Sequence, residues 1–158
     1  MKNNQESQMP TYASNKKAFH DYSIEESFEA GLALAGHEVK SIRAGNVSLN
    51  GAFVTIRNGQ AYLRNGYIGK YKQASNLEGY DEARERKLLI KKSELERLAG
   101  KTKEKGLTLI PLEIYTKRSW IKLKVGLGRG KKQYDKRDSI RKKEDKRKID
   151  RMIRTRTK

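Results

Sequence analysis

The sequence predicts a mainly β protein with short helices, followed by a basic tail. Three observations carry this prediction. Apolar and polar residues alternate over long stretches of the first 130 residues, an Asn-Gly pair marks a tight hairpin, and a Ser-x-x-Glu pattern marks a helix between strands. The chain of 158 residues has room for one domain with tails.

The first predicted strand covers residues 18–34, where apolar side chains occupy most of the even positions. Alternation of this length is typical of a strand, and we expect it to bend near Gly31. A short helix follows over His37–Ala44, because Val39 and Ile42 lie three residues apart. Gly45 then supplies a left-handed stop.

The Asn58-Gly59 pair is the strongest local signal, since both central residues of a type I′ turn need positive φ. Pairing outward from this turn sets Ile56 opposite Ala61 and Val54 opposite Leu63 on the core face. The other face combines aromatic and cationic residues, in the pairs Phe53 with Arg64 and Thr55 with Tyr62. A further short strand is expected over Tyr67–Tyr71.

A capping-box pattern at residues 93–96 predicts a helix that stops near Gly106. Two more strands follow over Leu107–Tyr115 and Trp120–Leu127, and Pro111 should lie at an edge or a bulge because it has no N–H for the ladder. Five or six short strands, with a helix before the last hairpin, favour a closed β-barrel of the OB type.

The charge points to a polyanionic partner. The chain holds 37 Lys or Arg against 19 Asp or Glu, a net charge of +18, and it has no Cys. Disulfides, zinc ribbons and thiol nucleophiles are therefore excluded, and no apolar run is long enough to span a bilayer. The polar N-terminal residues lack a secretory signal, which predicts a cytoplasmic protein. RNA, DNA and an acidic membrane surface remain open as partners.

Half of this excess charge lies in the last 28 residues, where 14 Lys or Arg face five Asp or Glu. Residues 131–158 have too few apolar side chains to offset the entropy of ordering, so we expect a tail that is disordered when free. Residues 1–14 are predicted to be disordered for the same reason. The folded barrel is then expected over residues 15–130.

No catalytic, cofactor or metal site is predicted. The chain has two His, and the adjacent pair His37-Glu38 does not form an acid–base dyad by adjacency alone, because neighbouring side chains project in different directions. The glycine-rich segment 126–130 follows a strand but leads into a Lys-rich tail, so we interpret it as a flexible hinge and not as a phosphate loop.

Aromatic residues interleaved with cations on exposed strands favour nucleic acid, because bases stack on aromatic rings and cations neutralise phosphates. Three clusters support this interpretation. They are Trp120, Lys122 and Lys124 on one strand face, Arg84, Arg86 and Lys87 just before an apolar run, and Phe53, Tyr62 and Arg64 on the outer face of the Asn-Gly hairpin.

Five separated blocks of sequence carry a resemblance to a known family. They occur in the order and spacing seen in bacterial small protein B (SmpB), the partner of transfer-messenger RNA. The blocks are residues 15–18 (NKKA), 28–32 (FEAGL), 36–45 (GHEVKSIRAG), 86–89 (RKLL) and 130–137 (GKKQYDKR). Residues 76–85 depart from the family pattern, which has a Pro there.

The resemblance implies an OB-type barrel that binds the tRNA-like domain of transfer-messenger RNA and delivers it to the A site of stalled ribosomes for trans-translation. Its RNA contacts fall on Asn15, Glu29, Leu89 and Lys122. Its ribosome-interacting tail, helical in the empty mRNA channel, falls on Gly130, Lys131, Lys132, Tyr134, Asp135, Lys136 and Arg137, with Met152 and Ile153 downstream. We expect a monomer.

Three other functions fit the composition. A basic ribosomal protein or assembly factor that binds rRNA is the main alternative. An RNA-processing enzyme would use His20 or His37, and a membrane-surface protein would use the basic tail, although its apolar stripe is too thin for firm anchoring.

Overall fold

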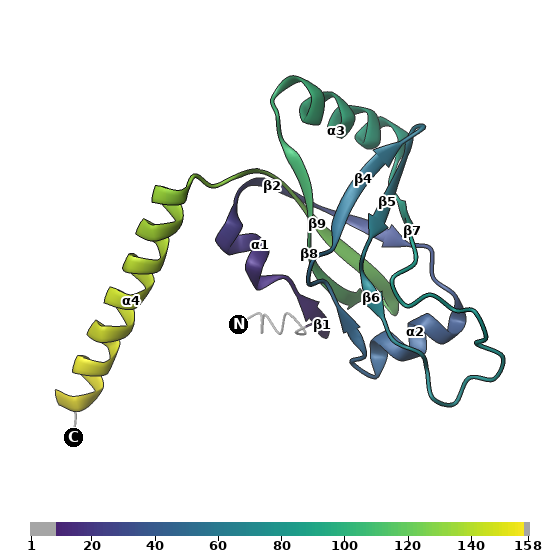
Figure 1. The fold of residues 1–158 in the computed structure, drawn as a ribbon, viewed down its shortest axis with the longest axis horizontal. Coiled ribbons are helices and arrows are strands. Elements are labelled where there is room, and N and C mark those ends of the chain that lie inside the picture. The colour runs from purple at the N-terminus through teal and green to yellow at the C-terminus, as the bar shows by residue number, and fades with distance from the viewer. Residues whose placement is uncertain (1–8, 157–158) are drawn as a thin grey trace, which may run out of the picture.

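The computed structural model describes residues 9–156 and is drawn in Figure 1. The strands are β1 (Thr11–Ser14), β2 (Tyr22–Leu32), β3 (Val47–Ser48), β4 (Phe53–Arg57), β5 (Gln60–Arg64), β6 (Tyr67–Ile68), β7 (Arg86–Leu89), β8 (Thr108–Lys117) and β9 (Trp120–Gly130). The helices are α1 (Lys16–Asp21), α2 (Gly36–Arg43), α3 (Lys92–Glu104) and α4 (Gln133–Arg156).

The prediction of a mainly β fold with short helices is confirmed, but the predicted closure into a barrel is wrong. Seven strands form one sheet in the order β1-β8-β9-β2-β7-β5-β4, and β3 pairs with β6 separately. Over residues 9–156 no ladder joins the edge strands β1 and β4.

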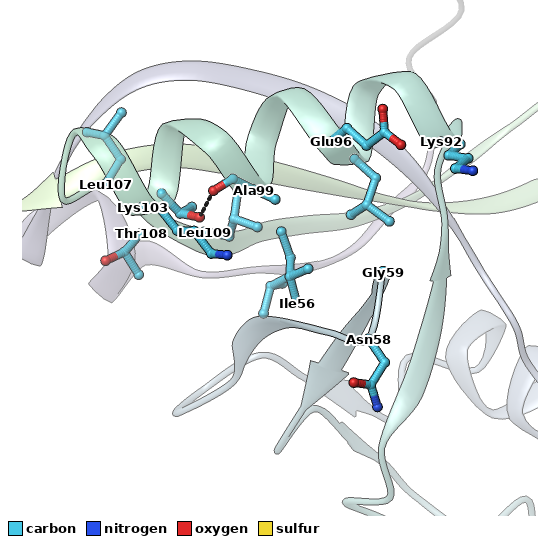
Figure 2. Close-up of a pocket in the computed structure, with 13 residues that line it drawn as sticks. Ile56, Asn58, Gly59, Lys92, Glu96, Ala99, Lys103, Leu107, Thr108 and Leu109 are labelled. Carbon is cyan, nitrogen blue, oxygen red and sulfur yellow. Dashed lines mark hydrogen bonds between the residues drawn. The ribbon is translucent and has the colours of Figure 1, made fainter.

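At the β4 edge, the sheet lies beside α3 and the start of β8. Side chains from β4, α3 and the start of β8 line a cleft of 470 Å³ there (Figure 2). Its walls include Ile56 of β4, Ala99 of α3 and Leu109 of β8. Apolar side chains therefore close this end of the core in place of backbone hydrogen bonds.

The long strand predicted over residues 18–34 is correct only from Tyr22 onward. Residues 16–21 form α1 because the Asn15 side chain accepts a hydrogen bond from the Ala18 amide and caps the helix. Ala18 is buried on this helix, which satisfies the same apolar position that the alternation had assigned to a strand.

The local turn signals are confirmed. Asn58 and Gly59 both have positive φ, at 51° and 68°, and the predicted pairs of β4 and β5 are all in register. The α2 helix covers the predicted segment except Ala44, which is its C-cap. The predicted α3 exists, but its predicted capping box is wrong, because the N-cap is Lys91, without a side-chain hydrogen bond, and Ser93 lies inside the helix. Pro111 lies beside a bulge in the β8–β9 ladder, as expected.

The glycine-rich segment is strand and not a hinge, which corrects our interpretation. β9 pairs with β2 up to Gly130, and Gly128 lies where the two backbones approach closely. A Cβ at Gly128 would lie 2.3 Å from the Ser23 carbonyl oxygen. Glycine is required at this position for the approach of the strands, not for motion.

The core lies between the inward faces of the bent sheet and the helices α2 and α3. Its most enclosed side chains are Ile42, Leu63, Ile68, Leu98, Leu112, Ile114, Leu123, Val125 and Leu127. Alternation on β9 places Leu123 and Val125 inward and Lys122 and Lys124 outward. The inward residues stabilise the fold, and the outward residues are available to a partner.

Two segments predicted to be disordered have regular structure. Residues 11–14 form β1, because Tyr12 and Ala13 pack on the core and the edge of β8 offers backbone partners. Residues 1–8, which the same prediction covered, lie outside the described residues.

The predicted disorder of the tail is not confirmed either, since residues 133–156 form the long helix α4. This segment has no Gly or Pro, Asp135 lies in its first turn, and Arg154 and Arg156 lie in its last. Both placements suit the helix dipole. None of its described side chains is buried, and Figure 1 shows α4 leaving the body. Within the part of the chain that the structure describes, no helix is long and apolar enough to cross a membrane.

The close approach at Gly128 predicts a matched pair of variants. Gly128→Ala should lower the free energy of unfolding by about 1–3 kcal/mol, because the added methyl meets backbone that cannot move without breaking the β2–β9 ladder. Gly130→Ala is the control, since a Cβ there has nothing within 4 Å, and it should stay within about 0.5 kcal/mol of the parent. Urea unfolding measures both, and equal effects would contradict the assignment.

Candidate nucleic-acid interface

The centre of the sheet brings together four of the predicted RNA-binding residues, Glu29, Leu89, Lys122 and Lys124. Glu29 on β2 lies opposite Lys124 on β9. Gly31, two residues on, lies opposite Lys122 on one side and Leu89 of β7 on the other. These four side chains therefore share the outward face of neighbouring strands, and we call this surface the central face.

Two hydrogen bonds fix one oxygen of the Glu29 carboxylate. Its Oε2 accepts a hydrogen bond from the Tyr115 hydroxyl at 2.5 Å and one from Lys117 Nζ at 3.3 Å. The Tyr115 bond is the largest influence that lowers the pKa of Glu29, so the group is ionised at neutral pH. Burial and the same bond raise the pKa of Tyr115, which therefore keeps its proton and remains the donor.

Both of these hydrogen bonds go to Oε2, so among residues 9–156 Glu29 Oε1 takes part in no hydrogen bond or ion pair, and Glu29 lines a hollow of 910 Å³. The hollow is also lined by Phe28, Lys124, Glu113 and Met9, and Lys124 Nζ lies 3.9 Å from the Glu113 carboxylate. A fixed acceptor beside a cation in an open hollow suits a ligand that carries both hydroxyl donors and negative charge, as RNA does.

Leu89 is an exposed apolar residue in a polar surface, with 54% of its area accessible. Its position depends on Gly31, where an added Cβ would lie 3.1 Å from Leu89 Cβ. The absence of a side chain at Gly31 lets Leu89 lie across β2. An exposed leucine held by the backbone in this way can pack on an unstacked base.

Trp120 lies at the tip of the β8–β9 hairpin and is 72% exposed. The tip is a tight turn in which Arg118 and Ser119 both have positive φ, and Arg43 of α2 donates a hydrogen bond to the Ser119 carbonyl at 3.1 Å. Trp120 shares a hollow of 430 Å³ with Glu29 and Lys122. The tip therefore extends the central face with an aromatic platform.

Two predicted contact residues, Asn15 and Arg86, are buried and make hydrogen bonds inside the protein. Asn15 is buried, and its amide donates to the Pro111 carbonyl at 3.0 Å while its oxygen caps α1. Arg86 has no exposed side-chain area. The prediction that the Arg86 guanidinium neutralises RNA phosphate is wrong, and the Asn15 side chain likewise has a structural use.

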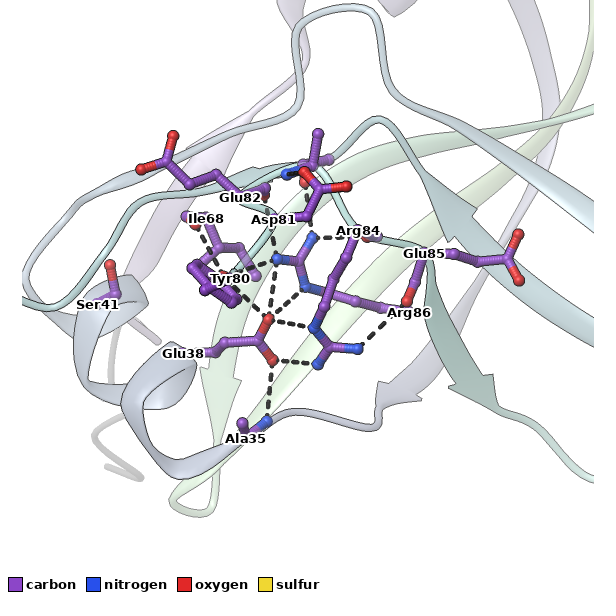
Figure 3. Close-up of polar contacts among 12 residues, drawn as sticks. Ala35, Glu38, Ser41, Ile68, Tyr80, Asp81, Glu82, Arg84, Glu85 and Arg86 are labelled. Atoms are coloured by element: carbon purple, nitrogen blue, oxygen red, sulfur yellow. Dashed lines mark hydrogen bonds and ion pairs between the residues drawn. The ribbon is translucent and has the colours of Figure 1, made fainter. Parts of the chain in front are cut away.

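Figure 3 shows the polar network around Arg86, whose guanidinium lies at its centre. Its N–H groups donate to the Glu38 carboxylate, to the Tyr80 hydroxyl and to main-chain carbonyls of residues 66, 82 and 84. These contacts use all the donors that an arginine has. The network ties the 69–85 loop to α2, and it defines the shape of the segment that departs from the family pattern.

Glu38 is the fully buried counter-ion of this network. It accepts hydrogen bonds from Arg84 Nε at 2.8 Å, from Arg86 Nε at 3.0 Å and from the Ala35 amide at 2.9 Å. Burial raises the pKa of Glu38, but these bonds outweigh it and lower the pKa from 4.5 to about 2. Glu38 is thus a structural anion and not an acid–base group.

The remaining predicted cations of this region, Arg84 and Lys87, differ in solvent exposure. Arg84 is partly exposed, with its guanidinium on Glu38, whereas Lys87 is exposed on β7. The two histidines also have local partners: His37 packs edge-on against Tyr80, and His20 Nδ1 lies 2.9 Å from Asp21. Neither histidine lies beside the central face residues in the pockets described above.

The predicted tail residues fall at the junction of β9 with α4 and at the far end of α4. The Lys131 amide donates to the Asp21 carbonyl at 2.8 Å, and Lys136 Nζ lies 3.5 Å from the Asp21 carboxylate. These contacts fix the start of α4 against α1. The other named tail residues are Gly130, Lys132, Tyr134, Asp135, Arg137, Met152 and Ile153, of which Tyr134, Met152 and Ile153 are mostly exposed.

Comparison with known proteins decides the family. The family model described as SmpB protein matches residues 12–155. The chain belongs to the SmpB family. SmpB-family relatives include the SsrA-binding proteins of Bacillus cytotoxicus, 51% identical, and Bacillus cereus strain G9842, 52% identical, each over 92% of this chain and 94% of that protein.

A solved structure supports the same assignment to the SmpB family. It is described as "tmRNA-SmpB: a journey to the center of the bacterial ribosome", and one of its chains is 47% identical to this one. The match covers 81% of this chain and 93% of that chain, with a TM-score of 0.63.

Sequence reasoning missed Tyr115 and Lys117, the residues that hold Glu29. The signal was present in the outward positions of Glu113, Tyr115 and Lys117, which alternate with the buried Ile114. The bulge beside Pro111 shifts the phase of alternation within β8, so counting from Leu109 places them wrongly.

The buried network predicts the effect of pH on stability. Because the folded pKa of Glu38 lies below its usual value of 4.5, its contribution is fully present above about that pH and is lost as the pH falls toward 2. At neutral pH, Glu38→Gln should lower the free energy of unfolding by about 3–5 kcal/mol, since it leaves Arg86 without its buried counter-charge. Urea unfolding from neutral to acid pH measures both effects.

The control for this variant is Glu96→Gln on α3, where the carboxylate is exposed. It should leave stability at neutral pH within about 0.5 kcal/mol of the parent. A Glu38→Gln protein as stable as the control, or one with the parent's loss of stability in acid, would contradict the role of Glu38.

Proposed function

We propose that this protein binds the tRNA-like domain of transfer-messenger RNA and delivers it to the A site of stalled ribosomes for trans-translation. The observation that carries the proposal is the family assignment: relatives about half identical over almost the whole chain are SsrA-binding proteins, and the similar solved structure is described as a tmRNA-SmpB structure. The central face supplies a surface of suitable chemistry for this RNA.

On this proposal, Lys122 and Lys124 neutralise backbone phosphates, while Glu29 Oε1 accepts a hydrogen bond from a base edge or a 2′-hydroxyl. Leu89 packs on an unstacked base, and Trp120 offers a stacking surface at the hairpin tip. Contacts of this kind recognise the shape and backbone of a folded RNA more than its sequence. Lys87 and the exposed edge of Arg84 add charge at the margin.

The tail has a separate role in the proposal. An unpacked helix of this composition is marginal in water, so we infer that residues 131–156 are largely unfolded in the free protein and form α4 inside the empty mRNA channel of the ribosome. The tail and mRNA compete for one anionic groove, so tail folding reports a vacant channel. Tyr134, Asp135, Lys136, Arg137, Met152 and Ile153 are the residues that this role uses.

We further propose that the body is of the OB type and that the protein acts by binding alone. The order of strands with α3 before the last hairpin supports an open OB-type body, and β1 extends it from the expected residues 15–130 to residues 11–130. The protein acts as a cytoplasmic monomer by binding alone, with no chemical step of its own.

The decisive experiment compares two RNAs and two chains. The full chain should bind a tRNA-like domain at least tenfold more tightly than random RNA of equal length in a gel shift, because a shape-specific surface discriminates where charge alone does not. A chain lacking residues 131–158 should keep this affinity but lose tagging of nascent chains on stalled ribosomes. Equal binding of the two RNAs would refute the function, and loss of binding on truncation would refute the division of roles.

Tyr115 offers a test of the central face. Tyr115→Phe should weaken binding of the tRNA-like domain about fivefold, because a hydrogen bond that fixes the Glu29 carboxylate is worth about 1 kcal/mol. In a Glu29→Gln background the same change should have little further effect, which a double-mutant cycle measures. Tyr12→Phe is the control, since that hydroxyl bonds Thr116 on the same sheet edge. Equal losses with and without the Glu29 carboxylate would contradict the coupling.

A further inference from the structure

A second patch lies beside the central face, on the outward side of β4, β5 and β7. Tyr62 of β5 is opposite Thr55 of β4 on one side and Lys87 of β7 on the other, so these side chains share one face. The intervening residues Val54 and Leu63 are buried in the core. We call this patch the hairpin face, and its members are Phe53, Thr55, Arg57, Tyr62, Arg64 and Lys87.

Two arginines on the hairpin face lie over aromatic rings. Arg57 Cζ is 4.9 Å from the centre of the Tyr62 ring, and Arg64 Cζ is 5.7 Å from that of Phe53. A guanidinium placed over a ring keeps its outer planar surface and its N–H edges available. Stacked pairs of this kind can hold a base against the outer surface of the guanidinium while their edges bind phosphate.

One carboxylate lies between the two arginines. Glu85 Oε1 is 2.8 Å from Arg57 Nη2, and Glu85 Oε2 is 3.4 Å from Arg64 Nε. The Glu85 carboxylate therefore pairs with both guanidiniums and competes with phosphate for them. Together with Lys87, the two arginines give the hairpin face three positive charges against the single negative charge of Glu85, so its net charge is +2.

The hairpin face continues the central face without a break. Lys87 and Leu89 are successive outward residues of β7, and Leu89 lies opposite Gly31 in the central face. Figure 1 shows that β7 joins β2 to β5 in the body of the sheet. A strand of RNA that crosses Leu89 thus has a route along β7 to Tyr62.

We propose that the hairpin face is a second binding surface for transfer-messenger RNA, in which Arg57 and Arg64 contact two phosphates of the strand that crosses Leu89. The proposal rests on the proposed function and extends it to residues outside the family contacts named above. RNA is the partner because its phosphates complement the net charge, its bases suit the stacked guanidiniums, and the neighbouring surface already suits RNA.

The test is a charge-removing pair of substitutions, Arg57→Gln with Arg64→Gln, assayed by binding of fluorescently labelled transfer-messenger RNA over a range of salt. Each phosphate contact contributes about 0.7 to the slope of log K against log salt, so losing two should reduce the slope by about 1.4. At ~0.1 M salt this corresponds to about 25-fold weaker binding.

The matched control removes two exposed lysines from α3, Lys92→Gln with Lys103→Gln. It lowers the net charge of the whole chain equally but leaves the hairpin face intact, so binding and salt slope should stay close to those of the parent. An arginine variant that behaves like this control, while the parent prefers transfer-messenger RNA to random RNA, would overturn the inference alone. A parent without that preference would overturn the proposed function as well.

A second variant distinguishes the loss of RNA contacts in the arginine double variant from a folding defect. Glu85→Gln removes the anion that competes with phosphate and so raises the net charge of the hairpin face by one. It should tighten binding about fivefold at ~0.1 M salt, from the same contribution per phosphate. Because a misfolded protein does not gain affinity, tighter binding supports the inference, and unchanged or weaker binding overturns it.

Discussion

The buried ion pair of Glu38 with Arg86 is the interaction on which the rest of the structure depends. A charge enclosed without compensation is very costly, so each of these residues requires the other, and Arg86 also requires the carbonyls around it. Arg86 is the first residue of β7, the strand that joins β2 to β5. The pair therefore fixes α2, the 69–85 loop and the middle of the sheet relative to one another.

Fixing β7 positions both surfaces that we assign to RNA. Leu88 points into the core, which forces Lys87 and Leu89 outward on either side of it. Leu89 belongs to the central face and Lys87 to the hairpin face. One short strand thus carries the buried Arg86 at its start and both outward residues, Lys87 and Leu89, that we assign to RNA.

The features that sequence reasoning found are those that neighbouring residues determine. The Asn58-Gly59 turn, the register of β4 with β5 and the extent of α2 all follow from local chemistry. The features that it missed depend on distant partners. Arg86 reads as a surface cation until its carboxylate, 48 residues away, is known. β1 is only four residues long, and it forms because Tyr12 and Ala13 pack on the core and the edge of β8 offers backbone partners.

The candidate site shows the same limit. Glu29, Leu89 and Lys122 were named from the family resemblance, and the register brings them together. Asn15 was named in the same way, yet its side chain is used to start a helix. Tyr115 was hidden because a bulge changes which residues of β8 face outward. Spacing in the sequence alone does not reveal such a change of phase.

When α4 is folded, as we infer for the protein in the mRNA channel, the joint between β9 and α4 holds the helix in a fixed direction relative to the body. A helix of 24 residues is about 36 Å long, so Met152 and Ile153 lie far from the sheet on a rod that Asp21 anchors at its base. One residue inserted at the joint would turn their side of the rod by about 100° without changing its composition. The folded helix therefore sets both the distance of Met152 and Ile153 from the body and the direction in which their side of the helix faces.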